Sequence, residues 1–140
     1  MRPTASRWAD IKERDLEQCA MCGTEYSLTH QHRRAVGMGG SKIPPTVEDS
    51  LTLCIDDNRD AEGHLQINAL VFGWKVRKWV QDPSLVPACY PHSIGWARLT
   101  TGGHAEPIHA MEAEQMMRDV YGEEWDRWCD EIGYLPPGRR

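Results

Sequence analysis

The sequence predicts an α+β fold built around two short strands and a helix, with one helix before this core and a strand/helix extension after it. Three observations carry the prediction. Apolar and polar residues alternate at 24–32 and again at 47–55, helical spacing follows at 57–72, and an amphipathic stretch occupies 108–130. A chain of 140 residues is long enough to bury such a core without covalent staples.

The elements up to the second strand are expected in the following order. A short helix is predicted over 6–18, where Trp8 and Ile11 recur at near-helical spacing among charged residues. The alternating segment 24–32 predicts the first strand of the core. The density of Gly and Pro at 37–45 is incompatible with helix or strand, so this segment is expected to be a loop before the second strand.

The elements after the core helix form the predicted extension. Alternation predicts further strands at 73–80 and 93–103, and the amphipathic stretch 108–130 predicts a helix or a helix pair broken at its single glycine. We therefore expect residues 1–80 to form the core with its N-terminal helix. Residues 81–140 are expected to form a tryptophan-rich strand and an acidic helical extension packed on that core.

Composition limits the class of protein. No apolar run approaches the roughly 20 residues of a membrane span, and the N-terminus lacks an apolar signal core. We therefore expect a cytoplasmic protein with no membrane partner. The five cysteines are odd in number and irregularly spaced, which favours free thiols or a metal site over a secreted disulfide framework.

The charge is unevenly distributed along the chain. A net charge of −5 argues against a general nucleic-acid binder, but the acidic residues concentrate at 105–131. The segment 28–45 contains no acidic residue. Candidate DNA-binding residues are Arg33, Arg34, Lys42, Lys75 and Lys78. A local cationic surface is compatible with this pattern, although the lysines at 75–78 could equally form an ordinary solvated strand face.

The segment HQHRRAVGMGG at 30–40 combines histidines, arginines and glycines at the end of the first predicted strand. A strand, loop, strand and helix in this order can hold one metal ion between strand and helix. Phosphodiester hydrolysis needs a histidine to activate water and a divalent cation to stabilise charge on the phosphate. The sequence supplies His32 on the strand, and Asn58 and Glu62 share one helical face at i, i+4. Arg33 and Arg34 are suited to bind phosphates.

Four segments in this order, CAMCG, HQHRRAVGMGGS, VEDSLTLC and GWKVRKW, resemble the HNH endonucleases of the ββα-metal fold, particularly those encoded by bacteriophages. The resemblance covers roughly residues 19–80 and is strongest in His-Arg-Arg followed by Gly-Met-Gly-Gly. It implies a ββα-metal core and hydrolysis of DNA phosphodiester bonds. It also implies the cytoplasm of a phage-infected or prophage-carrying bacterial host.

The resemblance assigns roles to individual residues. The family's general base falls on His32. The metal ligand before the base falls on Gln31, a neutral and weaker ligand than the usual Asp or His, with His30 one step further back as the alternative. The helix ligand falls on Asn58, or on Glu62 in longer spacings of the motif. This oxygen-rich set favours Mg²⁺ or Mn²⁺ as the catalytic ion.

Two departures from the family pattern support a second hypothesis. The family's central Asn falls on Asp49, which can accept hydrogen bonds from a loop but cannot donate any, and Gln31 is a weakened ligand. These changes favour a DNA- or protein-binding module with a phage assembly, packaging or replication protein as partner. The retained His32 and the basic loop favour an enzyme.

Many relatives also hold a structural zinc through two CxxC pairs. Cys19 and Cys22 supply the first pair, and Cys54 begins the second, whose last position is Asp57. Carboxylates do bind zinc, but three cysteines with one Asp is an uncommon set. The alternative is that these cysteines pack as small apolar groups.

Overall fold

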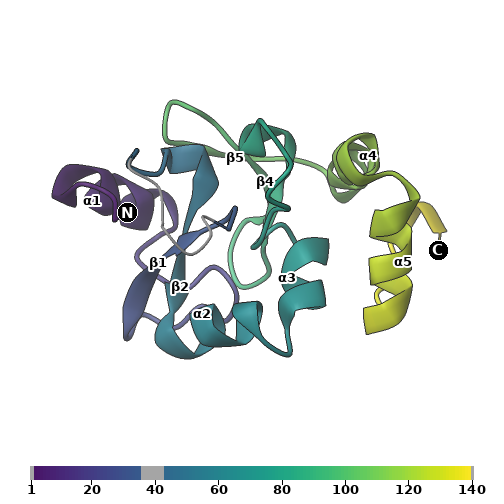
Figure 1. The fold of residues 1–140 in the computed structure, drawn as a ribbon, viewed down its shortest axis with the longest axis horizontal. Coiled ribbons are helices and arrows are strands. Elements are labelled where there is room, and N and C mark those ends of the chain that lie inside the picture. Colours follow the sequence, from purple (N-terminus) through teal and green to yellow (C-terminus); the bar gives the residue numbers. More distant parts are fainter. Residues whose placement is uncertain (1, 36–42, 140) are drawn as a thin grey trace.

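The computed structural model describes residues 2–35 and 43–139. Over these residues the fold is mixed α+β, with five α-helices and two small antiparallel sheets (Figure 1). The predicted fold class is therefore confirmed at this level. None of the helices in the described part of the chain combines the length and apolar character needed to cross a membrane.

The first sheet is a hairpin that positions the candidate site. Strand β1 (Leu28–His32) pairs antiparallel with β2 (Ser50–Cys54), and every residue of β2 is buried. Helix α2 (Ile55–Glu62) begins directly after β2. The predicted order of strand, strand and helix is thus observed. Most of the loop predicted between the strands falls on 36–42, outside the described residues.

Helix α1 (Ala5–Arg14) ends earlier than the predicted 6–18. The reason is local, because Leu16 and Glu17 have φ values of 62° and 55°, a left-handed conformation that cannot continue a helix. Asp15 takes the C-cap position and its buried carboxylate accepts hydrogen bonds from Thr52 N (2.9 Å) and the Tyr90 hydroxyl (2.6 Å). The early end of the helix therefore ties it to β2.

The prediction of one continuous helix over 57–72 is wrong. The structure has α2 and then α3 (Gln66–Val71), separated by a turn. Gly63 caps α2 with φ −115° and ψ −122°, which are not helical angles. The break lets α3 turn its Ala69, Leu70 and Val71 into the interior, where they are fully buried.

The strand predicted at 73–80 is also wrong. Gly73 turns the chain with φ 75°, and a Cβ at this position would lie 1.7 Å from a backbone oxygen, so only glycine fits. The segment then makes one isolated parallel bridge between Val76 and Arg34 instead of a ladder. No neighbouring strand is available to this segment among the described residues, and alternation alone cannot supply one.

The second sheet contains β3 (Ala88–Tyr90), β4 (Gly95–Leu99) and β5 (Ala105–Pro107), in that order. The predicted strand at 93–103 corresponds to β4. Its two partners were not predicted, because three residues are too few to show an alternating pattern.

The C-terminal helix pair is confirmed. Helix α4 (Ala110–Tyr121) and helix α5 (Glu123–Ile132) are separated by Gly122, whose φ is 63°. Figure 1 shows both helices at the opposite end of the molecule from α1. Helix α5 packs against α3 through a buried Trp125, whose indole N–H donates to Val71 O at 3.1 Å.

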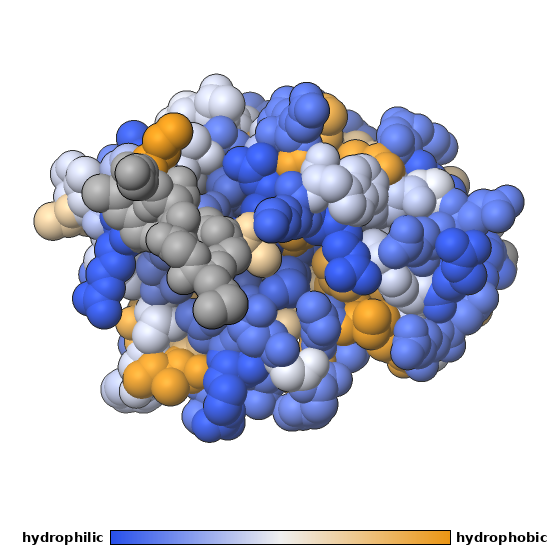
Figure 2. Space-filling model, in the orientation of Figure 1, coloured by the Kyte–Doolittle hydropathy of each residue, from blue (hydrophilic) through white to orange (hydrophobic). Residues whose placement is uncertain are grey.

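The hairpin and the extension share one of the two hydrophobic clusters. Leu51 and Leu53 of β2 pack in the same cluster as Ala97 and Leu99 of β4. The extension after residue 80 therefore shares part of its hydrophobic core with the hairpin. The face shown in Figure 2 is mostly hydrophilic, with hydrophobic residues confined to separate small areas.

Candidate functional site

His32 and Asp49 meet at one end of the hairpin. His32 ends β1, and Asp49 ends a short 3-10 turn (Val47–Asp49) immediately before β2. The Nε2 atom of His32 lies 2.8 Å from Oδ2 of Asp49. Because an ionised carboxylate only accepts, Nε2 carries the proton and Nδ1 is left as the nitrogen that can take one. The imidazole is 20% exposed, whereas the carboxylate of Asp49 is buried.

Arg34 completes the surroundings of Asp49. Its backbone N–H donates to Oδ1 at 3.1 Å, and its Nε donates to Oδ2 at 2.9 Å. The same guanidinium donates to the carbonyls of Val80 and Gln81 at 2.9 and 3.0 Å. Asp49 thus accepts hydrogen bonds from Arg34 and His32. Arg34 remains 28% exposed.

The expected role of Arg33 in phosphate binding requires correction. Its side chain is fully buried, and burial lowers its pKa to about 10. The guanidinium donates to five backbone carbonyls, those of Glu48, Gly73, Pro83, Val86 and Pro87. A group enclosed in this way cannot reach DNA. Arg33 instead holds three separate segments of the chain together.

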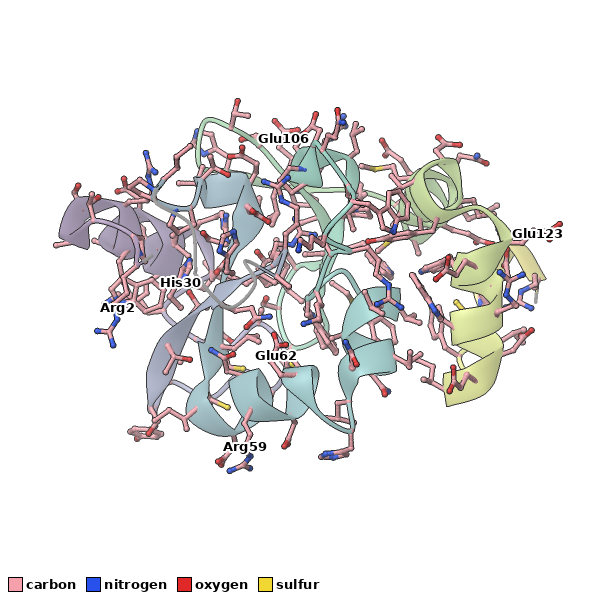
Figure 3. The ribbon with its side chains drawn as sticks, in the orientation of Figure 1. Arg2, His30, Arg59, Glu62, Glu106 and Glu123 are labelled. Carbon is pink, nitrogen blue, oxygen red and sulfur yellow. The ribbon has the colours of Figure 1, made fainter. Side chains whose placement is uncertain are left out.

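His30 and Gln31 lie on opposite faces of β1, because neighbouring strand residues alternate. His30 shares its face with His32, and the two ring centroids are 6.3 Å apart. The Oγ of Ser50 donates to Thr46 O at 2.7 Å, so at 2.8 Å it accepts the Nε2 proton of His30. In Figure 3 His30 lies on the side of α1, whereas Glu62 lies at the end of α2. Of the two alternative ligands, only Gln31 lies with the helix residues.

Burial, followed by the nearby His32, lowers the pKa of His30 from 6.5 to about 4. The unfolded state therefore takes up a proton at this residue at a higher pH than the folded state. We expect stability to be complete above about pH 6.5 and to fall as the pH decreases toward 4. The measurement is the melting temperature of wild type and His30→Gln between pH 7 and 5. The wild type should lose more stability than the variant, and parallel pH profiles would contradict this expectation.

Gln31 and Glu62 come together, but a third residue joins them. The Nε2 of Gln31 lies 3.5 Å from Oε1 of Glu62, and the Nζ of Lys75 lies 2.5 Å from Oε2. Asn58 is one turn earlier on α2, and its amide nitrogen donates to Thr29 Oγ1 and His30 O at 2.9 and 3.2 Å. Its side chain therefore ties α2 to β1.

The other predicted DNA contacts have different outcomes. Lys75 is buried and paired with Glu62, so the prediction that it contacts DNA is wrong. Its position depends on the turn at Gly73, which the alternating pattern of 73–80 did not reveal. Lys78 is exposed and remains a candidate. Lys42 lies outside the described residues.

The cysteine group forms at the other end of the hairpin. The ligand atoms of Cys19, Cys22, Cys54 and Asp57 all lie within 4.8 Å of one another, so this group could hold a metal ion. Cys19 donates to Asp57 Oδ2 at 3.1 Å, and the sulfurs of Cys22 and Cys54 are 3.9 Å apart. The turn that carries Cys19 and Cys22 thus meets the turn that carries Cys54 and Asp57, although 31 residues lie between Cys22 and Cys54 in the sequence.

The electrostatics of this group suit a cation. Burial raises the pKa of the Cys19 and Cys54 thiols. Burial also raises the pKa of Asp57, but hydrogen bonds from the three thiols outweigh it and lower that pKa. A bound cation would stabilise the thiolates that burial disfavours. Cys22 is exposed, so simple apolar packing does not account for the whole group.

The hairpin therefore separates two candidate sites. His32 pairs with Ser50 at one end of the strands, beside Asp49, and Leu28 pairs with Cys54 at the other end. Protein-family models, curated proteins and solved structures were compared with this chain, and none of them matches it.

Proposed function

We propose that this protein is a phage-encoded DNA endonuclease of the HNH type, which hydrolyses phosphodiester bonds with His32 as general base. The observation that carries the proposal is the hydrogen bond of 2.8 Å between His32 and the buried Asp49 at the end of a hairpin that is followed by a helix. A partly exposed imidazole with a fixed tautomer is the arrangement that general-base catalysis needs.

In this proposal Nδ1 of His32 takes a proton from water as the water oxygen bonds to phosphorus. The bond from phosphorus to the leaving oxygen breaks in the same displacement, and that oxygen departs with the bonding electron pair and takes a proton from solvent water. The imidazolium that forms is stabilised by the carboxylate of Asp49 at Nε2. Arg34 lies beside Asp49 and is partly exposed, so it is placed to bind a phosphate oxygen.

A catalytic Mg²⁺ or Mn²⁺ would be held by Gln31, Asn58 and Glu62. As these side chains are arranged, they do not fit a divalent ion. Glu62 supplies the only carboxylate of the set, and the ammonium of Lys75 neutralises it. The amide nitrogen of Asn58 is used to hold β1.

The same ion pair favours a second candidate function, a DNA- or protein-binding module that has lost the reaction. Its partner would be DNA or a phage packaging or replication protein. A plasmid-nicking assay with Mg²⁺, Mn²⁺, Zn²⁺ and no added metal separates the two candidates. Nicking that requires His32 supports the enzyme, and binding of DNA without nicking under any condition supports the module.

We further propose that Cys19, Cys22, Cys54 and Asp57 hold a structural zinc, because thiolates select zinc over Mg²⁺. Purified protein should carry about one zinc equivalent that resists mild chelation. Cys22→Ser should lower the zinc content and the melting temperature, while Cys89→Ser, outside the group, should preserve both. Elemental analysis and thermal denaturation are the measurements.

Asp57→Cys provides the opposite test of the same group, since it completes a four-thiolate set. It should retain zinc at chelator concentrations that strip the wild type. Absence of zinc from the wild type, together with a melting temperature that chelator leaves unchanged, would assign these cysteines to packing.

A further inference from the structure

We infer that the ammonium of Lys75 occupies the cation position beside Gln31 and Glu62, so that this site excludes a divalent metal ion and cleavage proceeds without one. The inference rests on the proposed endonuclease function for its catalytic part. Its metal-binding part concerns the folded protein alone.

The chain brings Lys75 to this position through backbone contacts. Gly73 turns the chain after α3, and Lys75 N then donates to Ala69 O at 3.1 Å. The next residue, Val76, donates its N–H to Arg33 O at 2.9 Å. The segment is thereby held alongside the end of β1, which is the strand that carries Gln31. The ion pair with Glu62 therefore forms between two ordered elements.

Burial of the lysine makes this ion pair different from an ordinary surface pair, while the side chain of Glu62 is 52% exposed. The side chain of Lys75 is 8% exposed, and its Nζ lies 2.5 Å from Oε2 of Glu62. A lysine removed from water is costly unless a partner compensates its charge. The other oxygen of Glu62 faces the amide of the buried Gln31 at 3.5 Å. Both carboxylate oxygens thus have partners within the fold.

The charges of the site sum to zero. Gln31 and Asn58 are neutral, and the single negative charge of Glu62 is matched by Lys75. A divalent ion bound to Glu62 would stand close to the ammonium and be repelled by it. To make room for a metal ion, the ammonium of Lys75 would have to give up its ion pair with Glu62. The ammonium also retains N–H donors beyond the one directed at Glu62.

The decisive test measures Mn²⁺ binding by the electron paramagnetic resonance signal of free Mn²⁺, using full-length protein whose cysteine group is loaded with zinc. Wild type should show no specific Mn²⁺ binding. Lys75→Met, which keeps the length and removes the charge, should bind one Mn²⁺ at least about tenfold more tightly than wild type. Adding Glu62→Gln should abolish the gain. Lys78→Met, which changes an exposed lysine nearby in the sequence, should show no specific Mn²⁺ binding, like wild type.

Wild-type Mn²⁺ binding that Glu62→Gln removes would overturn the inference, even if Lys75→Met failed to fold. Circular dichroism establishes the folding of each variant. A folded Lys75→Met protein that still binds no Mn²⁺ would also overturn it.

A DNA cleavage assay provides the second test of the inference. With the zinc retained, nicking by wild type should change less than about twofold between chelated and Mg²⁺-containing buffer, because bound metal contributes nothing. A strict requirement for Mg²⁺ would contradict the inference. Absence of nicking in every buffer would contradict the proposed function, while the Mn²⁺ measurements would still decide the metal question.

Discussion

Replacing His32 with Ala is expected to reduce DNA nicking by about 10²- to 10⁴-fold, the range that general-base assistance contributes. Folding should be nearly intact, because the imidazole is partly exposed and Asp49 keeps its two hydrogen bonds from Arg34. DNA affinity should also be nearly unchanged. The measurements are initial nicking rates on supercoiled plasmid, DNA binding and thermal denaturation of the same preparations.

Two further variants locate the effect. Asp49→Ala should also slow nicking, because no side-chain acceptor then holds the imidazole in the Nε2–H tautomer. His30→Gln should have a smaller effect than His32→Ala, since the Nε2 of His30 is committed to Ser50. A loss under one order of magnitude in His32→Ala would exclude His32 as the base and make His30 the next candidate.

Replacing Arg33 with Met should destabilise the fold by about 3–5 kcal/mol, because several buried carbonyls would lose a charged donor together. The affected acceptors belong to segments near residues 48, 73 and 83–87. A loss of this size should lower the melting temperature by roughly 10 °C or more. Arg33→Lys should also destabilise, because one ammonium cannot reproduce the contacts of a guanidinium.

Arg59→Met is the matched control. Its side chain is 69% exposed and contacts Asp56 and Asp60 at 3.5 Å each, so stability should change by less than about 0.5 kcal/mol. DNA affinity of folded Arg33→Met protein should equal that of wild type. A melting temperature like that of Arg59→Met, combined with weaker DNA binding, would restore Arg33 as a phosphate contact.

These expectations connect stability with the candidate active site. Arg33 and Arg34 are neighbours in the sequence and were assigned the same role, yet one is buried and the other partly exposed. Arg33 fixes the segment around Gly73 to the end of β1, and the same segment carries Lys75. A variant that weakens this attachment is therefore expected to disturb the ion pair with Glu62 as well as the fold.

Features that depend on residues close together in the chain could be predicted from the amino-acid sequence. Alternation located β1 and β2, and helical spacing with one glycine located α4 and α5 on either side of Gly122. The resemblance to a family with two CxxC pairs implied Cys19, Cys22, Cys54 and Asp57, which the structure brings together as a group that could hold a metal ion. Such patterns are readable because backbone geometry repeats over a few residues.

Contacts between side chains that are far apart in the chain could not be predicted in this way. The segment 73–80 alternates like a strand but has no strand to pair with in the described structure, and Gly73 turns it so that Lys75 reaches Glu62. Arg33 turns inward because carbonyls some 40 to 54 positions further along the chain converge on its guanidinium. Partners at that separation leave no periodic trace in the sequence, since burial and pairing depend on how distant segments pack.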